Sequence, residues 1–262
     1  MADLLKLVDL GVEYPTRFGV FQAIKGINLS LAPGEIHGIV GESGAGKSTV
    51  GAAIIGLIPS PGYIANGEVQ LDGKNLGELT QSEYHKLRGA RISMIFQDPQ
   101  TSLNPLLTIE DQVVETVRQH SEVSYKAARR QTIELLEETG IRDAEMRMRE
   151  YPHQFSGGMR QRVVIALALC TNPQIVIADE PTTALDVATQ KQILDLIRKL
   201  AKTRNVAFIL ITHDIGVIAE ITDNVSVLRG GELMEMGATN QVLNAPKSDY
   251  TRALMAAVQR LE

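Results

Sequence analysis

One stretch of this chain decides its fold: residues 41 to 48 read Gly41-Glu42-Ser43-Gly44-Ala45-Gly46-Lys47-Ser48. It follows a short apolar run, Ile36 to Val40, and opens a run with helical period, Lys47 to Leu57. The eight residues match the P-loop pattern G-x-x-x-x-G-K-S/T. Glycines at these spacings let successive backbone N–H groups curl around phosphate oxygens, and the positive end of the helix points at the same charge. The stretch therefore predicts a strand, a phosphate-binding turn and a helix.

The side chains at the end of this loop have separate expected roles. We expect the Lys47 ammonium to reach the β- and γ-phosphates of a nucleotide and the Ser48 hydroxyl to coordinate Mg²⁺. Thr49, the next residue, completes the expected nucleotide-binding set of residues 41 to 49.

A second candidate site follows an apolar strand, Ile175 to Ala178, which runs into Asp179 and Glu180. P-loop NTPases place an aspartate near Mg²⁺ at the end of a neighbouring strand, so we assign Asp179 to the Mg²⁺ shell. Glu180 is then the candidate general base that polarises the attacking water. If the strand continues through both acids, their side chains point to opposite faces, which suits two different roles.

Composition narrows the class of protein. The 262 residues are 44% hydrophobic and 22% charged, as in an ordinary globular enzyme, and the net charge of −5 argues against a nucleic-acid binder. Cys170, the single cysteine, lies in an apolar run and is expected to be a small buried core residue. The longest apolar run, Val50 to Ile58, is too short to cross a bilayer, and no signal peptide is seen. We expect a cytoplasmic protein with at most a peripheral membrane role.

The order of predicted elements indicates the fold class. Strand-like and helix-like runs alternate on both sides of a charged, helix-patterned segment, Ile109 to Glu150, which predicts an α/β fold with a helical insert. Before the insert, strands are expected at Leu4 to Tyr14, Ile27 to Leu31, Glu35 to Val40, Gly67 to Leu71 and Ile92 to Phe96. After it, strands and helices are expected at Ile175 to Ala178, Val187 to Leu200, Val206 to Ile211, Ile215 to Glu220 and Val225 to Leu228. The buried stripe of the helix after Asp186 is predicted to comprise Val187, Ile193, Leu194, Leu196, Ile197 and Leu200.

A second phosphate-binding helix start is predicted at Ser156-Gly157-Gly158-Met159. The serine is a good helix cap, and the two glycines allow close approach of an anion to the helix. A chain with two such starts binds two nucleotides or shares each nucleotide with a second copy, and the residues alone leave both readings open.

With this motif in place the chain resembles the ATP-binding cassette family. Landmarks stand in the family's order over the whole chain: Tyr14 as the adenine-stacking aromatic, the P-loop, Gln97, the Asp179-Glu180 pair and His213. Ala184-Leu185-Asp186 resembles the loop that crosses the dimer interface. Phe155 and Met159 depart from the commoner Leu and Gln of the family's signature motif, and Phe18 and Phe21 compete with Tyr14 for the stacking role.

The resemblance implies a P-loop NTPase (RecA-like) core with a mainly parallel sheet, an N-terminal antiparallel β subdomain and an inserted α-helical subdomain. We expect one domain over 1–262, with the core at 1–98 and 160–262 and the helical signature subdomain at 99–159. Two ATP molecules would be sandwiched in a head-to-tail dimer, each on one P-loop and under Ser156, Gly157, Gly158 and Met159 of the partner. Ser48, Gln97 and Asp179 would hold Mg²⁺, and His213 would contact the γ-phosphate.

Further stretches of the sequence resemble segments typical of one branch of this family, the importers of dipeptides, oligopeptides, nickel and glutathione. These are Phe96 to Pro105, His153 to Arg162 and Tyr250-Thr251-Arg252-Ala253-Leu254. The branch implies a second cassette (identical or paralogous), membrane permease subunits, indirectly a solute-binding protein, and a place on the cytoplasmic face of a bacterial inner membrane. Many relatives add a cysteine-rich C-terminal extension, which the single cysteine does not supply. The chain could equally be the first cassette of a tandem protein.

Two other classes of function compete with the transporter reading. A soluble cassette ATPase, such as a repair factor, usually carries a long coiled coil, whereas the insert between Gln97 and Ser156 is short and without sustained heptads. A scaffold module would have a degenerate site, whereas every residue expected for turnover is present. The sequence does not identify the transported substrate.

Overall fold

The computed structural model describes residues 3–183 and 185–258, and its contacts separate into two compact units. The first unit comprises Met1–His85 with Ala201–Glu262, and the second comprises Lys86–Leu200. The predicted helical subdomain, 99–159, falls inside the second unit, and its own boundaries stay a prediction.

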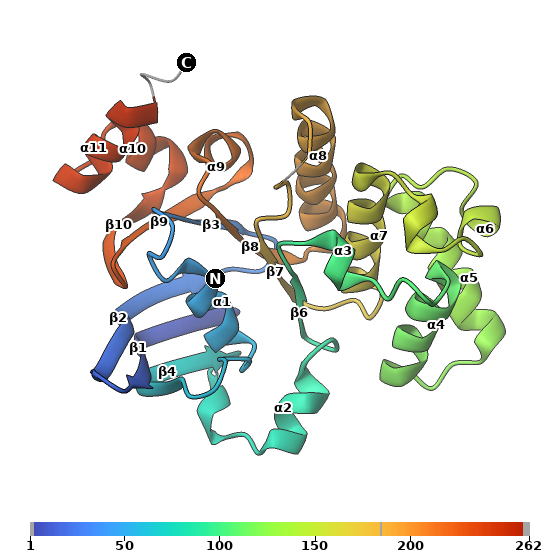
Figure 1. The fold of residues 1–262 in the computed structure, drawn as a ribbon, viewed down its shortest axis with the longest axis horizontal. Coiled ribbons are helices and arrows are strands. Elements are labelled where there is room, and N and C mark those ends of the chain that lie inside the picture. The colour runs from blue at the N-terminus through green and yellow to red at the C-terminus, as the bar shows by residue number, and fades with distance from the viewer. Residues whose placement is uncertain (1–2, 184, 259–262) are drawn as a thin grey trace. The chain divides into compact units, whose positions relative to one another are not determined.

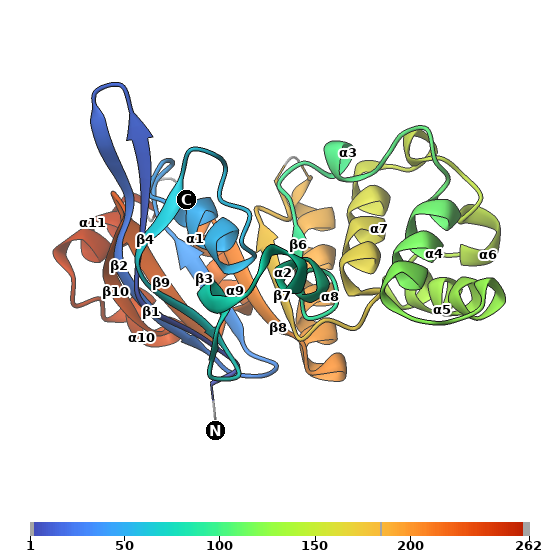
Figure 2. The ribbon, with the colours of Figure 1, turned by 90° about the horizontal axis from the view of Figure 1, so that it is seen from below.

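The first unit contains an antiparallel sheet with the strand order β2-β1-β4-β5 (Figure 1). The strands are β1 (Leu5–Thr16), β2 (Gly19–Leu31), β4 (Tyr63–Leu71) and β5 (Lys74–Asn75). The hairpin of β1 and β2 pairs from Leu5↔Leu31 to Thr16↔Gly19, and its tip extends beyond the rest of this sheet (Figure 2). The predicted antiparallel β subdomain is confirmed, but β2 and β4 begin earlier than Ile27 and Gly67, where the sequence placed them.

The same unit holds the strand that leads into the P-loop. β3 (Ile36–Val40) pairs in parallel with β8 (Ala207–Thr212) and β9 (Asn224–Arg229), and β10 (Glu232–Ala238) pairs antiparallel to β9. β3 is buried along its whole length, as expected for the centre of a parallel sheet. The helical elements of this part of the chain are α1 (Lys47–Ile54), η1 (Leu76–Glu78), α2 (Gln81–Leu87), α9 (Ile215–Ile221), α10 (Thr239–Asn244) and α11 (Asp249–Val258). Helix α1 stops short of the predicted Leu57 because Gly56 takes a left-handed conformation, with φ 64°.

The second unit pairs β6 (Ile92–Ile95) with β7 (Ile175–Asp179) in parallel. Its helical elements are α3 (Pro99–Ser102), α4 (Ile109–His120), α5 (Tyr125–Glu138), α6 (Ala144–Arg147), η2 (Pro152–Gln154), α7 (Gly157–Leu169) and α8 (Val187–Arg204) as far as Leu200, where the unit ends. The predicted helical character of 109–150 is confirmed, and local caps explain where its helices begin. Thr108 and Asp111 form a capping box at α4, and Ser124 accepts a hydrogen bond from Ala127 at α5.

The buried face of α8 is mostly as predicted. Ile193, Leu194 and Ile197 are fully buried, but Val187 is 85% exposed, so its inclusion in the stripe was wrong. Val187 is the first residue of the helix, where the chain is still at the surface. Cys170 is buried as expected, and this burial raises the pKa of its thiol to about 12. No described helix is both long and apolar enough to span a bilayer.

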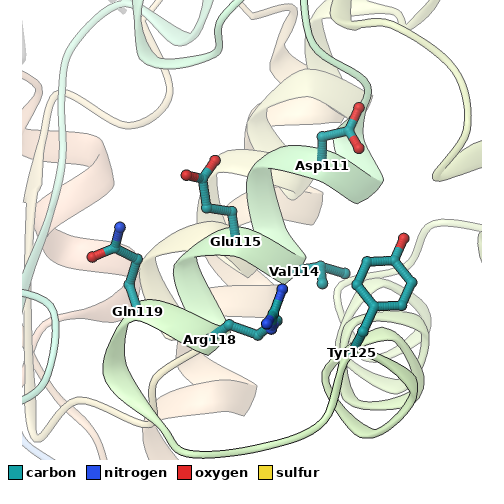
Figure 3. Close-up of a pocket in the computed structure, with 6 residues that line it drawn as sticks. All are labelled: Asp111, Val114, Glu115, Arg118, Gln119 and Tyr125. Atoms are coloured by element: carbon teal, nitrogen blue, oxygen red, sulfur yellow. The ribbon is translucent and has the colours of Figure 1, made fainter.

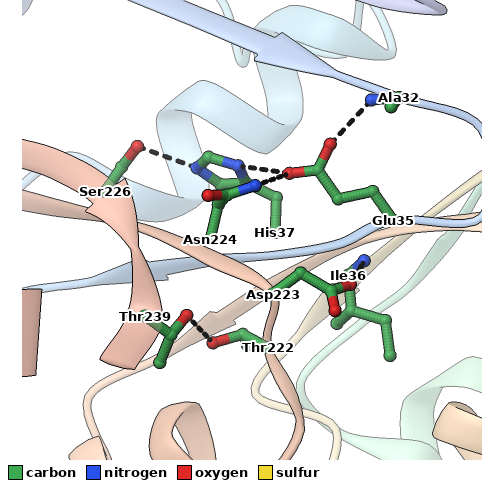
Figure 4. A network of polar contacts seen from close by, with 9 residues as sticks. All are labelled: Ala32, Glu35, Ile36, His37, Thr222, Asp223, Asn224, Ser226 and Thr239. Carbon is green, nitrogen blue, oxygen red and sulfur yellow. Dashed lines mark hydrogen bonds and ion pairs between the residues drawn. The ribbon is translucent and has the colours of Figure 1, made fainter. Parts of the chain in front are cut away.

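A polar network ties the start of β3 to its neighbours (Figure 4). His37 is buried, with Nδ1 at 3.3 Å from the Glu35 carboxylate and Nε2 at 2.9 Å from the Ser226 hydroxyl. The Glu35 carboxylate also accepts from the Ala32 backbone N–H at 2.7 Å and from the Asn224 amide at 2.7 Å. Burial alone would raise the pKa of Glu35, but the hydrogen bonds from His37, Ala32 and Asn224 outweigh it and lower the pKa.

This lowered pKa predicts a dependence of folding stability on pH. The folded pKa lies below the ordinary value of 4.5, so the stabilisation by the Glu35 carboxylate is complete above that value and is lost as pH falls through the folded pKa. Glu35→Gln keeps the shape of the side chain and should flatten the decline of the free energy of unfolding between pH 6 and pH 3, measured by urea denaturation. Glu134→Gln, at an exposed position on α5, is the control and should keep the wild-type decline. An unchanged slope in Glu35→Gln would show that the network does not respond to its ionisation.

Candidate nucleotide-binding and hydrolysis site

The P-loop is held in place by close backbone packing within the first unit. A methyl group at Gly46 would lie 2.8 Å from the Ala23 carbonyl oxygen, and Gly46 has φ 97°, so only glycine fits there. The Gly231 N–H donates to the Ala45 carbonyl at 3.0 Å. The loop is therefore clamped between strand β2 and the turn that joins β9 to β10.

Helix α1 begins at Lys47 with its first turn free of acidic side chains and of any side-chain cap. A helix start normally has its N–H groups satisfied by a Ser, Thr, Asp or Asn cap. Here the cap position is Gly46, which leaves these groups to an external acceptor. An uncapped, positively polarised helix start behind a glycine-rich turn is suited to binding a phosphate group.

Lys47 is almost fully buried, and its ammonium donates to the carbonyls of Gly41 at 2.8 Å and Glu42 at 3.0 Å. The side chain therefore folds back along the inside of the loop instead of extending into solvent. Ser48 is exposed and Thr49 half-buried at the same helix start. The structure thus gathers the predicted residues 41–49 into one loop and one helix start.

The register of the parallel strands brings His213 to the same edge of the sheet. Val40, the last residue before the P-loop, pairs with Thr212, the last residue before His213. Asp214 then caps helix α9 by accepting from the Gly216 N–H at 2.8 Å, and its own N–H donates to the Thr212 hydroxyl at 3.0 Å. His213 is exposed between this strand end and this cap.

The aromatic residues of the hairpin lie in different surroundings. Tyr14 packs on the backbone of Gly62, since a methyl group there would lie 2.4 Å from the Tyr14 ring. Phe21, its register partner, is 60% exposed and borders a hollow of about 520 Å³ that Gly44 also lines. Phe18, at the tip, is 92% exposed. The structure therefore places Phe21 nearer to the P-loop hollow, and the stacking role of Tyr14 stays a prediction.

In the second unit, Gln97 and Glu180 meet beyond two paired strands. Ile95 and Ala178 are register partners in β6 and β7, and each strand ends within one residue of that pair. The Gln97 amide nitrogen donates to the Glu180 carboxylate at 3.0 Å, and the Thr183 hydroxyl donates to the same oxygen at 2.8 Å. Thr183 was missed by the sequence analysis, although its place three residues after Glu180 is a common spacing for such a contact.

The expected alternation of Asp179 and Glu180 across a continuous strand is wrong. β7 ends at Asp179, and Glu180 has φ 48°, a left-handed conformation that is uncommon for a residue with a side chain. The backbone turn, not the pleat of a strand, separates the two carboxylates: Asp179 is buried at 8% exposure, and Glu180 is half-buried. Strain of this kind is typical of functional sites.

Oxygen donors of this kind fit Mg²⁺, which is usually bound by one or two carboxylates together with the phosphates of a substrate. Within the described parts of the chain, no three His, Cys, Asp or Glu side chains gather into a cage that could hold a metal by themselves. A sparse protein ligand set of this type suits a metal ion that arrives with a nucleotide.

The signature motif forms a capped helix start. The Ser156 hydroxyl accepts from the Met159 N–H at 3.3 Å, and Ser156 and Gly157 are exposed at the start of α7. Phe155 is buried at 3% exposure, and its carbonyl accepts from the Arg160 guanidinium at 3.0 Å. The departure from the family's commoner Leu therefore falls on a core position, where one apolar side chain replaces another.

Leu185 of the predicted interface loop packs on this helix start, and Asp186 binds a residue that packs on it. A methyl group at Gly158 would lie 2.5 Å from the Thr189 methyl, and one at Gly157 would lie 3.7 Å from Leu185. Asp186 accepts from the Thr189 N–H at 2.9 Å and from its hydroxyl at 2.7 Å, and these bonds lower the pKa of Asp186. Ala184 lies outside the described residues. Thr189 was not predicted, and its spacing of three residues from Asp186 was the available signal of a helix cap.

A further hollow, of about 600 Å³, lies on helices α4 and α5 (Figure 3). It is lined by Asp111, Val114, Glu115, Arg118, Gln119 and Tyr125. Two of these side chains already have partners, because Asp111 caps α4 and the Tyr125 hydroxyl donates to Glu110 at 2.7 Å. The lining mixes both signs of charge, so we assign it no part in nucleotide binding.

Comparison with known proteins gives this arrangement a family. The family model described as "ABC transporter" matches residues 24–183. An oligopeptide transport ATP-binding protein (OppD) of Bacillus subtilis is 47% identical over 260 residues, which are 99% of this chain and 73% of the relative. A dipeptide transport ATP-binding protein (DppD) of the same organism is 45% identical over 263 residues, which are 100% of this chain and 78% of the relative.

Solved structures agree with these relatives. The dimeric bacterial ABC transporter cassette MJ0796 is 32% identical, with a TM-score of 0.79 over 90% of this chain and 98% of its own, and one of its structures is a post-hydrolysis dimer bound to ADP and Pi. The cassette cbiO1 of Clostridium perfringens is 28% identical, with a TM-score of 0.81 over 100% of this chain and 98% of its own. The predicted P-loop NTPase fold and the resemblance to the peptide-import branch are confirmed. The chain belongs to the ABC transporter family, as an ATP-binding cassette that binds and hydrolyses ATP.

Proposed function

We propose that this cassette powers the import of peptides, or of a related small solute, through membrane permease subunits. The observation that carries the proposal is the similarity, over essentially the whole chain, to oligopeptide and dipeptide transport ATP-binding proteins. This similarity favours a transporter over a soluble assembly. The chain would act on the cytoplasmic face of a bacterial membrane as a peripheral subunit, with a solute-binding protein as an indirect partner.

Each candidate residue has a role in ATP hydrolysis in this proposal. The backbone of residues 41–49 and the Lys47 ammonium bind the phosphates, and His213 contacts the γ-phosphate. Glu180, fixed by its hydrogen bonds from Gln97 and Thr183, orients and deprotonates the attacking water. Tyr14, with Phe21 as the competing side chain, stacks on the adenine.

Ser48, Gln97 and Asp179 would hold Mg²⁺ in this proposal. The ion would supply charge compensation to the phosphate oxygens in the transition state. The protein's own contribution is positional. Asp179 is buried, and the paired ends of β6 and β7 hold the acidic residues of the proposed site in place. The P-loop, which is packed against its neighbours, holds the phosphate-binding residues in place.

The exposed signature residues Ser156 and Gly157 would contact the ATP of a second cassette, identical or paralogous, together with Gly158 and Met159. The dimers formed by the cassette MJ0796 support this part of the proposal. Residues 184–186 would cross the same interface. ATP binding would close the dimer, hydrolysis would reopen it, and the helices of the second unit would pass the motion to a permease.

The phosphate role of Lys47 can be tested by substitution. Lys47→Ala should weaken ATP binding by about 10- to 100-fold, since a charge-assisted hydrogen bond to phosphate is worth about 1.5–3 kcal/mol. Titration with a fluorescent ATP analogue measures the change. Lys6→Ala, at an exposed position on β1, should leave the affinity unchanged. Equal affinities in the two variants would remove Lys47 from the site.

The assignment of Glu180 as the base predicts a loss of turnover without a loss of binding. Glu180→Gln should reduce kcat for phosphate release at least about 100-fold, the usual contribution of a positioned general base. ATP affinity should stay within a few-fold of wild type. Glu134→Gln serves as the matched control. Hydrolysis at the wild-type rate in Glu180→Gln would show that another group activates the water.

A shared site predicts a dimer that depends on ATP. The Glu180→Gln variant should change from the 28.6 kDa monomer to twice that mass in light scattering when ATP is added. Adding Ser156→Arg should abolish the dimer and leave ATP binding intact, because the arginine blocks only the contact with the partner's nucleotide. A monomer that still binds ATP would indicate that the working partner is a different cassette.

A further inference from the structure

Helix α11 packs on a buried cluster that includes the last residue of the strand leading into the P-loop. Tyr250, Leu254 and Met255 of this helix, with Leu243 of α10, cover a buried cluster in the first unit. The cluster comprises Val40, Ile215, Ile218, Val225, Val227 and Val242. Val40 is the residue that precedes Gly41. The helix thus covers the cluster to which this residue belongs, although none of its residues has a role in the proposed site.

Tyr250 has the most specific surroundings of these side chains. The Arg229 guanidinium lies over its ring, 4.8 Å from the centroid, an arrangement that favours a cation–π interaction. Arg229 ends strand β9, and the carbonyl of the preceding Leu228 lies so close to Gly41 that a methyl group there would be 2.2 Å away. Tyr250 therefore packs on the strand end that supports the first residue of the P-loop.

The hydroxyl of Tyr250 is buried beside the Glu42 carboxylate, and among the described residues it makes no hydrogen bond of good geometry. Burial raises the pKa of Tyr250, and the charge of the nearby Glu42 carboxylate raises it further, so the hydroxyl stays protonated. Glu42 belongs to the P-loop, and its carbonyl oxygen accepts from the Lys47 ammonium at 3.0 Å. Glu42 thus links the two side chains: it lies beside Tyr250 of helix α11, and its carbonyl oxygen binds Lys47.

We propose that Tyr250 is a positioning residue for ATP binding: with Arg229 it supports Glu42 and the start of the P-loop in the conformation that presents Lys47 to the phosphates. The role rests on ATP binding at the P-loop, and it assigns a function to the Tyr250-Thr251-Arg252-Ala253-Leu254 segment. Tyr250 itself does not touch the reacting atoms.

Tyr250→Phe separates this role from simple packing. The variant keeps the ring and its contact with Arg229 and removes only the hydroxyl beside Glu42. No hydrogen bond of good geometry is lost in this variant, so the melting temperature should change little. We expect the Kd for Mg-ATP, measured by isothermal titration calorimetry, to rise about 3- to 10-fold, and the KM for ATP to rise similarly with kcat little changed.

Three further variants complete the test. Tyr125→Phe removes another tyrosine hydroxyl beside a glutamate, far from the P-loop in sequence, and should leave the Kd unchanged. Glu42→Gln should weaken binding, and adding Tyr250→Phe to it should cause little further loss, because the hydroxyl acts through Glu42. Tyr250→Ala should weaken binding more than Tyr250→Phe does.

The outcomes distinguish this role from the nucleotide site itself. Tyr250 would be a packing residue if Tyr250→Phe bound Mg-ATP with wild-type affinity and if Tyr250→Ala lost affinity only in proportion to the fall in its melting temperature. Additive effects of Glu42→Gln and Tyr250→Phe would contradict a route through Glu42. A wild-type chain that failed to bind Mg-ATP would contradict the nucleotide site as well as the positioning role.

Discussion

The parallel pairing of β3 is the constraint on which the phosphate half of the site depends. Val40 pairs with Thr212 on one side and with Val227 on the other, so three chain segments leave the sheet at one edge. The P-loop, His213 and the turn after β9 follow directly from those strand ends. β3 is buried on both faces, and a shift of one residue in this register would exchange those faces and displace the P-loop relative to His213 and the supporting turn.

Sequence patterns predicted the elements whose signals are local. The glycines of the P-loop, the apolar run before Asp179 and the helical period of 109–150 each depend on neighbours in the chain, and each was found in the structure. Strand β10 and the early starts of β2 and β4 were missed, because these segments are largely exposed and carry little periodicity. β10 and β2 are fixed by hairpin pairing with β9 and β1, and β4 by pairing with the distant β1. Pairing with neighbouring strands, and not the local preference of the residues, determines where such strands begin and end.

The candidate site shows the same division. The candidate site residues were chosen by type and order along the chain, since these are the residue types that phosphate and Mg²⁺ chemistry require, and their roles stay a prediction. Their orientation was not predictable: the left-handed turn at Glu180 and the bonds from Gln97 and Thr183 to its carboxylate arise from the paired ends of β6 and β7. The choice between Tyr14 and Phe21 also depends on which face of the hairpin meets Gly62, and alternation alone cannot supply that information.

Contact between helix starts explains how a binding event can be transmitted inside the second unit. Gly158 on α7 and Thr189 on α8 pack so closely that a methyl group at Gly158 would lie 2.5 Å from the Thr189 methyl, and Thr189 is also the residue that Asp186 binds. Any displacement of the signature helix start must therefore displace the capped start of α8 and the interface loop with it. Close-packed contacts of this kind transmit small shifts because they do not deform continuously. The absence of side chains at Gly157 and Gly158 thus allows this close contact between the two helix starts, and in the proposed function it also leaves the start of α7 open to an anion.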